Sequence, residues 1–94
     1  FVFDCNDGMV QHIDAQGMSG TGTITFSNEL EGNTYTLLFV QGSGTHNATL
    51  PAGYWINDAA FDFSTLANDD RAILTATRIY SAWYYAAKKL TYAS

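Results

Sequence analysis

Turn-forming residues recur at short intervals along the whole sequence and leave little room for long helices. Glycine, asparagine and aspartate cluster in stretches such as "NDG" at 6–8, "NELEGN" at 28–33 and "QGSGTHN" at 41–47. Asp-Gly favours the positive φ of a type I′ turn, so "NDG" predicts a tight hairpin. The segments between turns are about five to ten residues long and rich in β-branched and aromatic residues, as β-strands are. We expect strands near 1–5, 9–14, 21–27, 33–41, 46–50, 54–57, 71–80 and 82–92.

Alternation within these segments predicts an all-β fold. "TGTITFS" at 21–27 places Ile24 and Phe26 on one face. "NTYTLLFVQ" at 33–41 carries apolar residues on both faces, so we expect a central strand that is covered on both sides. Seven or eight short strands at regular spacing favour a small antiparallel β-sandwich, with jelly-roll-like or Ig-like topology.

The stretch "AAFDFSTLANDD" at 59–70 has no period of two, and it predicts an irregular crossover. Asp62 or Ser64 would cap a single helical turn over 65–68, because Asp and Ser side chains accept hydrogen bonds from free N–H groups at a helix start. We expect Phe61, Phe63 and Leu66 to fold back into one end of the core.

The stretch "RIYSAWYYAAKKLTYA" at 78–93 fits two structures. Ile79, Trp83 and Leu90 lie at helical spacing, and Ala-Ala-Lys-Lys-Leu has good helix propensity. The threonine-rich segment before it and the alternation of 82–92 favour a β-hairpin, which agrees with the strands upstream. We favour the hairpin, and a helix over 82–90 remains the alternative.

Composition limits the functional classes. The 94 residues form one domain, and its start at Phe1 inside an expected strand indicates the C-terminal part of a longer chain. The net charge is −5 with only four basic residues, so a phosphate-binding surface for nucleic acid is not expected. Charged residues make up 14% of the chain, well below the roughly 25% of an ordinary soluble domain. This composition suits secreted proteins, particle shells and fibres.

No motif indicates catalysis, a cofactor or a metal site. The aspartates lie in predicted turns, where their side chains usually accept backbone hydrogen bonds. Cys5 is the only cysteine, and we expect a small buried side chain rather than a catalytic thiol.

Aromatic residues supply the one candidate ligand site. Carbohydrate-binding modules stack sugar rings on exposed aromatic side chains, and polar neighbours would add hydrogen bonds. The alternative is that these aromatics are buried in the core or between subunits, as large aromatics usually are. The candidate ligand or interface aromatics are Tyr54, Trp55, Trp83, Tyr84, Tyr85 and Tyr92, with Asn57 and Asp58 as polar partners.

Three segments together resemble a known kind of domain. They are "GNTYTLLFVQG" at 32–42, "TLPAGYWIND" at 49–58 and "FDFSTLANDDRAILTATRIYSAWYYA" at 61–86. The pattern resembles a small β-sandwich domain at the C-terminal end of bacteriophage virion structural proteins, and it covers roughly residues 24–92. The "SAWYYAAKK" segment departs from it, because a glycine-containing turn before the tryptophan is more typical. The matching residues look like framework: Gly32, Tyr35, Gln41, Gly42, Pro51, Trp55, Leu74 and Trp83.

The resemblance implies a structural module of a phage particle, in a head fibre, spike, decoration or tail protein. Such a module would act by assembly with other copies of itself, plausibly as a trimer, and with other virion proteins. The alternative is a carbohydrate- or receptor-binding module that contacts a host-surface glycan through the aromatic platform. Neither role involves membrane insertion, because no apolar run approaches the roughly 20 residues of a spanning helix.

Overall fold

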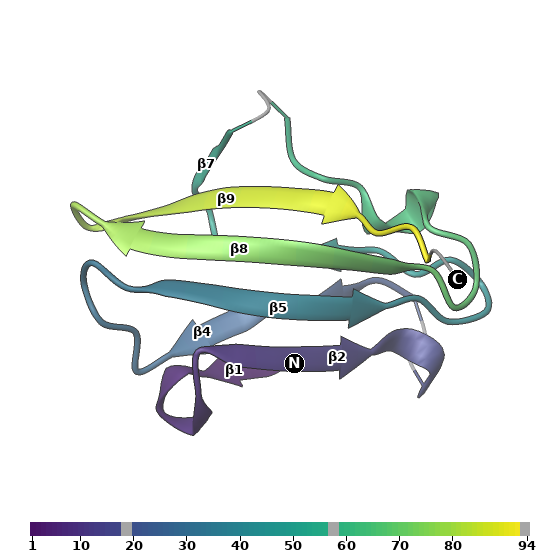
Figure 1. The fold of residues 1–94 in the computed structure, drawn as a ribbon, viewed down its shortest axis with the longest axis horizontal. Helices are drawn as coiled ribbons and strands as arrows, with labels where there is room; N and C mark the ends of the chain where they lie inside the picture. The colour runs from purple at the N-terminus through teal and green to yellow at the C-terminus, as the bar shows by residue number, and fades with distance from the viewer. Residues whose placement is uncertain (18–19, 57–58, 93–94) are drawn as a thin grey trace.

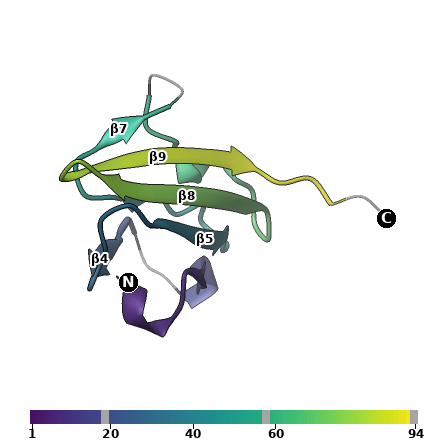
Figure 2. The same cartoon turned by 60° about the vertical axis from the view of Figure 1, so that its left-hand side comes forward.

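The computed structural model describes residues 1–17, 20–56 and 59–92. These residues form an all-β domain with nine strands, three 3-10 turns and no α-helix (Figures 1 and 2). Among them, no helix has the length and apolar character needed to cross a membrane. The strands are β1 (Val2–Asp4), β2 (Val10–Asp14), β3 (Gly22–Thr23), β4 (Thr25–Ser27), β5 (Thr34–Val40), β6 (Ala48–Thr49), β7 (Tyr54–Trp55), β8 (Arg71–Ile79) and β9 (Ala82–Lys89).

The chain winds as a coil rather than as an antiparallel sandwich. Strand β1 pairs with β4, β2 with β5 and β3 with β6, and all three pairs are parallel. Each coil therefore stacks on the one before it, with a repeat of roughly 25 residues, as in a β-solenoid of about three turns. The expected jelly-roll-like or Ig-like sandwich is wrong, because alternation predicts strands but carries no information about their direction.

The coils build two facing layers. One is a five-stranded sheet in the order β2-β5-β8-β9-β7. The other contains β1, β3, β4 and β6, and Figure 1 shows β1 and β4 behind β2 and β5. Backbone hydrogen bonds join the strands of this layer. The Thr25 N–H donates to the Phe1 carbonyl at 3.0 Å, and the Ile24 N–H donates to the Thr49 carbonyl at 2.8 Å. The predicted hairpin at "NDG" is wrong, because a 3-10 turn (Cys5–Asp7) leads the chain from one layer to the other.

The third coil reverses direction and ends the stack. Strand β8 lies antiparallel to β5, and β9 returns antiparallel to β8. Tyr80 and Ser81 form the turn between them, with φ of 53° and 58°, the left-handed values of a type I′ turn. The hairpin prediction for 78–92 is confirmed, and the helical alternative is wrong. Strand β7, which precedes β8 in the sequence, pairs in parallel with the first half of β9.

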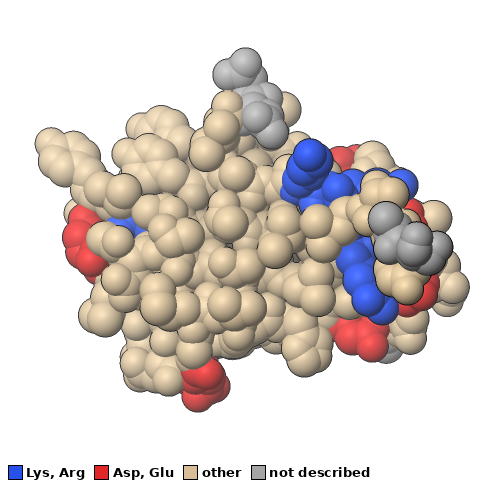
Figure 3. Space-filling view, viewed as in Figure 1, with Lys and Arg blue, Asp and Glu red and all other residues tan. Residues whose placement is uncertain are grey.

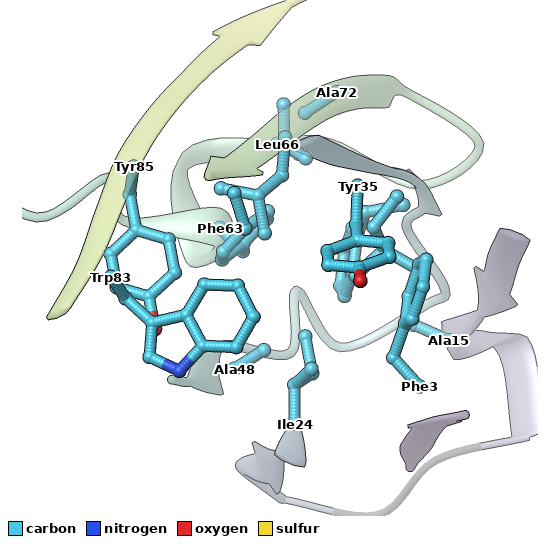
Figure 4. Packing of buried hydrophobic residues seen from close by; sticks show 14 residues of the cluster. Phe3, Ala15, Ile24, Tyr35, Ala48, Phe63, Leu66, Ala72, Trp83 and Tyr85 are labelled. Carbon is cyan, nitrogen blue, oxygen red and sulfur yellow. The ribbon is translucent and has the colours of Figure 1, made fainter. Parts of the chain in front are cut away.

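The core fills the space between the layers (Figure 4). As predicted, Phe63 and Leu66 of the 59–70 crossover are fully buried, and Phe63 packs against Phe39 with ring centroids 4.7 Å apart. The helical turn lies at Phe63–Thr65 rather than at 65–68, and Asp62 caps it by accepting from the Ser64 N–H at 2.9 Å. The buried apolar residues are Phe3, Ala15, Ile24, Tyr35, Leu37, Phe39, Ala48, Phe63, Leu66, Ala72, Leu74, Ala76, Trp83 and Tyr85.

One polar side chain, Gln41, is fully buried at the end of β5. Its amide nitrogen donates to the backbone carbonyls of His46 and Phe63, each at 2.8 Å. Its amide oxygen accepts from the N–H groups of Gly42 and His46, each at 3.0 Å. Gln41 therefore ties the loop after β5 to the crossover, and it satisfies two buried backbone groups, of Gly42 and Phe63, and two part-buried ones of His46.

Candidate functional site

The structure divides the six predicted aromatics between the core and the surface. Trp83 and Tyr85 are buried, and their rings stack with centroids 6.2 Å apart. Alternation along β9 turns both of them inward, away from any ligand. Both were candidate ligand or interface aromatics, and the structure places them in the core, so Tyr85 cannot form part of an exposed platform.

Buried Tyr85 has a structural role. Its hydroxyl donates to the carbonyl of Pro51 at 2.9 Å, which anchors the loop before β7. Burial raises the pKa of this phenol well above its usual value, and the nearby Arg78 guanidinium opposes that shift. Trp55 is half-buried beside it, with ring centroids 5.1 Å apart. Trp55 therefore supports the core more than it presents a ligand surface.

Tyr54 and Tyr84 form the surface part of the predicted platform. They face each other across β7 and β9, and their rings stack with centroids 5.3 Å apart and 16° between planes. Tyr54 is 65% exposed. Tyr92 is 92% exposed, but it lies beyond the other end of β9, in a cleft of about 480 Å³ beside Asp69, Asp70 and Arg71. The predicted polar partners, Asn57 and Asp58, lie outside the described residues.

The largest candidate site is the solvent side of the five-stranded sheet, here called the outer face. It consists of the outward side chains of β2, β5, β8 and β9, and Figure 3 shows a broad surface almost free of charged groups. Thr36, Thr75 and Ala86 form one row across the sheet, and Leu38 and Ile73 lie in the next. Thr34 and Thr77 form a third row with Tyr84, and their hydroxyl oxygens lie 2.7 Å apart.

Asp14 and Arg71 lie in the row at one end of this face, and Lys88 lies on β9 in the same row as Leu38 and Ile73. Arg71 lies 3.8 Å from Asp69, and Lys89 lies 3.4 Å from Asp70, in exposed ion pairs that contribute little stability. A hydrogen bond from the Ala67 N–H holds the pKa of Asp70 below its usual value, with help from Lys89. Asp69 and Asp70 serve the turn before β8, and the uncharged centre of the outer face consists of Thr36, Leu38, Ile73 and Thr75 on the two inner strands β5 and β8.

The sequence indicated this face only indirectly. It predicted that 33–41 is a central strand covered on both sides, and β5 is indeed internal in its sheet. Tyr35, Leu37 and Phe39 pack into the core, whereas Leu38 and Val40 are half-exposed on the outer face. The second covering layer that the pattern predicts is not supplied by the described part of the chain.

The reactive residue types are dispersed. Within 1–17, 20–56 and 59–92, no group of His, Cys, Asp and Glu side chains could hold a metal ion. Asp4, Asp14 and Asp62 each accept a backbone N–H from a residue two positions later. Burial raises the pKa of the Cys5 thiol, which disfavours the reactive thiolate.

Comparisons with protein-family models, curated proteins and solved structures found no match to this chain. Within the described residues, the outer face and the stacked Tyr54–Tyr84 pair are the surfaces that suit a partner or ligand.

Proposed function

We propose that this chain is a structural module of a bacteriophage virion that acts by subunit assembly through the outer face. The class of particle protein comes from the resemblance: a head fibre, spike, decoration or tail protein exposed on the virion surface. The occupant of the outer face is another copy of the chain, and a closed trimer suits a fibre or spike. The proposal assigns the chain no catalytic activity.

The observation that supports this proposal best is the uncovered second side of β5 and β8. Leu38, Ile73 and Thr75 form an uncharged patch in the middle of this surface, and Lys88, the register partner of Ile73, borders it on β9. Interface cores are depleted in charged residues in the same way, and threonine hydroxyls can pair across a contact without a large desolvation cost. Burial of this surface against a second copy would supply the missing layer.

The test is a charge placed in the middle of the face. Thr75 is half-buried at its centre, so Thr75→Arg would leave an unpaired charge in any subunit contact there. We expect the wild-type chain to be a closed oligomer at micromolar concentration, and we expect Thr75→Arg to lower its mass in light scattering coupled to size exclusion.

Thr49→Arg is the matched control, because Thr49 is exposed on β6 in the other layer. It should leave the mass unchanged. A wild-type chain that is monomeric up to high micromolar concentration would contradict assembly through this face. The particle assignment is tested separately, by searching purified virions for peptides of the chain with mass spectrometry.

The stacked Tyr54–Tyr84 pair favours a second candidate function, the binding of a host-surface glycan. Tyr54 offers an exposed ring, and Thr77 lies beside Tyr84 in the same row. If this site binds sugar, Tyr54→Ala should weaken binding on a glycan array by at least about tenfold, because aromatic contact dominates such sites. Tyr92→Ala, which alters an exposed tyrosine away from the pair, is the control. Equal loss of glycan binding in Tyr54→Ala and Tyr92→Ala would contradict a sugar site at the Tyr54–Tyr84 pair.

A further inference from the structure

The two edges of the five-stranded sheet differ in how they are closed. At one edge, β7 covers part of β9, and the Ile56 N–H donates to the Tyr85 carbonyl at 3.0 Å. The rest of β9 carries Lys88 and Lys89, and lysine on an edge strand opposes further strand pairing. At the other edge, β2 lies at the rim of the molecule beside β1 (Figure 1). Strand β2 contains neither lysine nor proline.

The free side of β2 presents a regular set of backbone groups. The Thr36 N–H donates to the Met9 carbonyl at 2.7 Å, and Val10 is the register partner of Thr36. In a parallel ladder, alternate residues of a strand bond to the same neighbour. The N–H and C=O groups of Val10 and His12 and the N–H of Asp14 therefore point away from β5, toward solvent, while the Asp14 carbonyl begins the 3-10 turn (Ala15–Gly17).

Apolar side chains accompany this open edge. Val10 is 72% exposed, and Phe1, Val2 and Met9 at the same end are also exposed. A coil at the end of a solenoid normally has a polar outer surface that caps the stack. Within the described residues, the first coil presents these apolar side chains in place of a polar cap, whereas the antiparallel hairpin closes the last coil.

We propose that β2 is a strand-pairing site for a second copy of the chain, in which two β2 strands run antiparallel about a two-fold axis at His12. In this register, Val10 of each copy lies opposite Asp14 of the other, and His12 lies opposite His12. The outward residues of one strand then meet the outward residues of the other, so their free N–H and C=O groups pair mutually.

The side chains are compatible with this register. Asp14 of one copy lies diagonally across from His12 of the other, at roughly 7–8 Å between Cα atoms. No two carboxylates face each other, because each Asp14 lies opposite a valine.

This contact goes beyond the proposed function, because it uses the backbone groups at the edge of β2 and not the side chains of β5 and β8 in the middle of the outer face. The Thr75→Arg chain, in which the outer-face contact is disrupted, is therefore the right background for testing the edge.

The experiment compares two changes at one residue. His12→Pro removes an outward N–H but no ladder bond to β5, because proline is tolerated on an edge strand when its nitrogen faces solvent. His12→Ala keeps that N–H and removes only the imidazole. In light scattering at about 100 μM, where weak pairing is populated, Thr75→Arg and Thr75→Arg/His12→Ala should be dimers. Thr75→Arg/His12→Pro should have half their mass.

A Thr75→Arg chain that is monomeric under these conditions would overturn the proposal, and so would a His12→Pro variant that stays dimeric. Circular dichroism checks that the proline variant is folded. Amide hydrogen exchange of the Thr75→Arg chain gives a second measurement that needs no proline. The amides of Val10, His12 and Asp14 should exchange at least about tenfold more slowly at high than at low concentration. Equal rates at both concentrations, whether fast or slow, would reject pairing with a second copy.

Discussion

Gln41→Met is expected to destabilise the fold by roughly 3–5 kcal/mol, even though methionine is apolar and of similar size. The change removes the partners of four backbone groups: the carbonyls of His46 and Phe63 and the N–H groups of Gly42 and His46. Each group left without a partner in the interior costs about 1–3 kcal/mol, and some will be partly rescued by water. Chemical denaturation measures the loss, and the melting temperature should fall by more than about 10 °C.

Gln16→Met is the matched control, because Gln16 is exposed in the loop of the preceding coil. The same substitution there should change the free energy of unfolding by no more than about 0.5 kcal/mol. If both variants had equal stability, Gln41 would not be the residue that holds the loop after β5 against the crossover.

Gly42→Ala should lower the free energy of unfolding by about 2–3 kcal/mol, an unusually large loss for one added methyl group. A Cβ at this position would lie 2.5 Å from the Ala15 carbonyl oxygen and 2.6 Å from the Gln16 Cα. Both are backbone atoms of the coil below, so they cannot move aside as the end of a flexible side chain can. Urea denaturation measures the effect.

Ser43→Ala changes the next residue, which is exposed, and it should leave the unfolding midpoint almost unchanged. A Gly42→Ala chain as stable as the wild type would mean that the two loops do not approach as closely as the structure shows. The pair of variants thus tests the stacking of the second coil on the first.

The sequence predicted the strands well because their signals are local. Each expected strand contains an observed one, and 21–27 is divided into β3 and β4 at Ile24. The hairpin at Tyr80–Ser81 was predicted without a glycine, because its flanking segments alternate. The coil itself could not be deduced, since parallel and antiparallel strands have the same period of two.

An internal repeat was the signal that could have revealed the coil. "AQGMSGTGTI" at 15–24 resembles "VQGSGTHNATL" at 40–50, roughly one coil later. Part of the repeat shows in the structure, where Gly22 and Thr23 pair with Ala48 and Thr49. Without this repeat, the sequence predicts neither the parallel stacking nor the open edge of β2.

The candidate site was predicted in part, for a similar reason. Alternation separates Trp83 and Tyr85 from Tyr84, but it cannot say which set faces the core. The structure shows that Trp83 and Tyr85 face the core. The ring centroid of Trp83 lies 4.4 Å from that of Phe26 in the other layer. The threonine-rich outer face carries no motif, because its character comes from the absence of charge across strands distant in the sequence.

The lysines and β7 at the β9 edge limit how far the chain can polymerise. A molecule with two open edges can add neighbours without end, as amyloid fibrils do. In the five-stranded sheet of the described residues, β2 is the edge that neither another strand nor lysines protect, so pairing of two β2 strands occupies that edge on both copies. Association through the β2 edge would therefore stop at a pair.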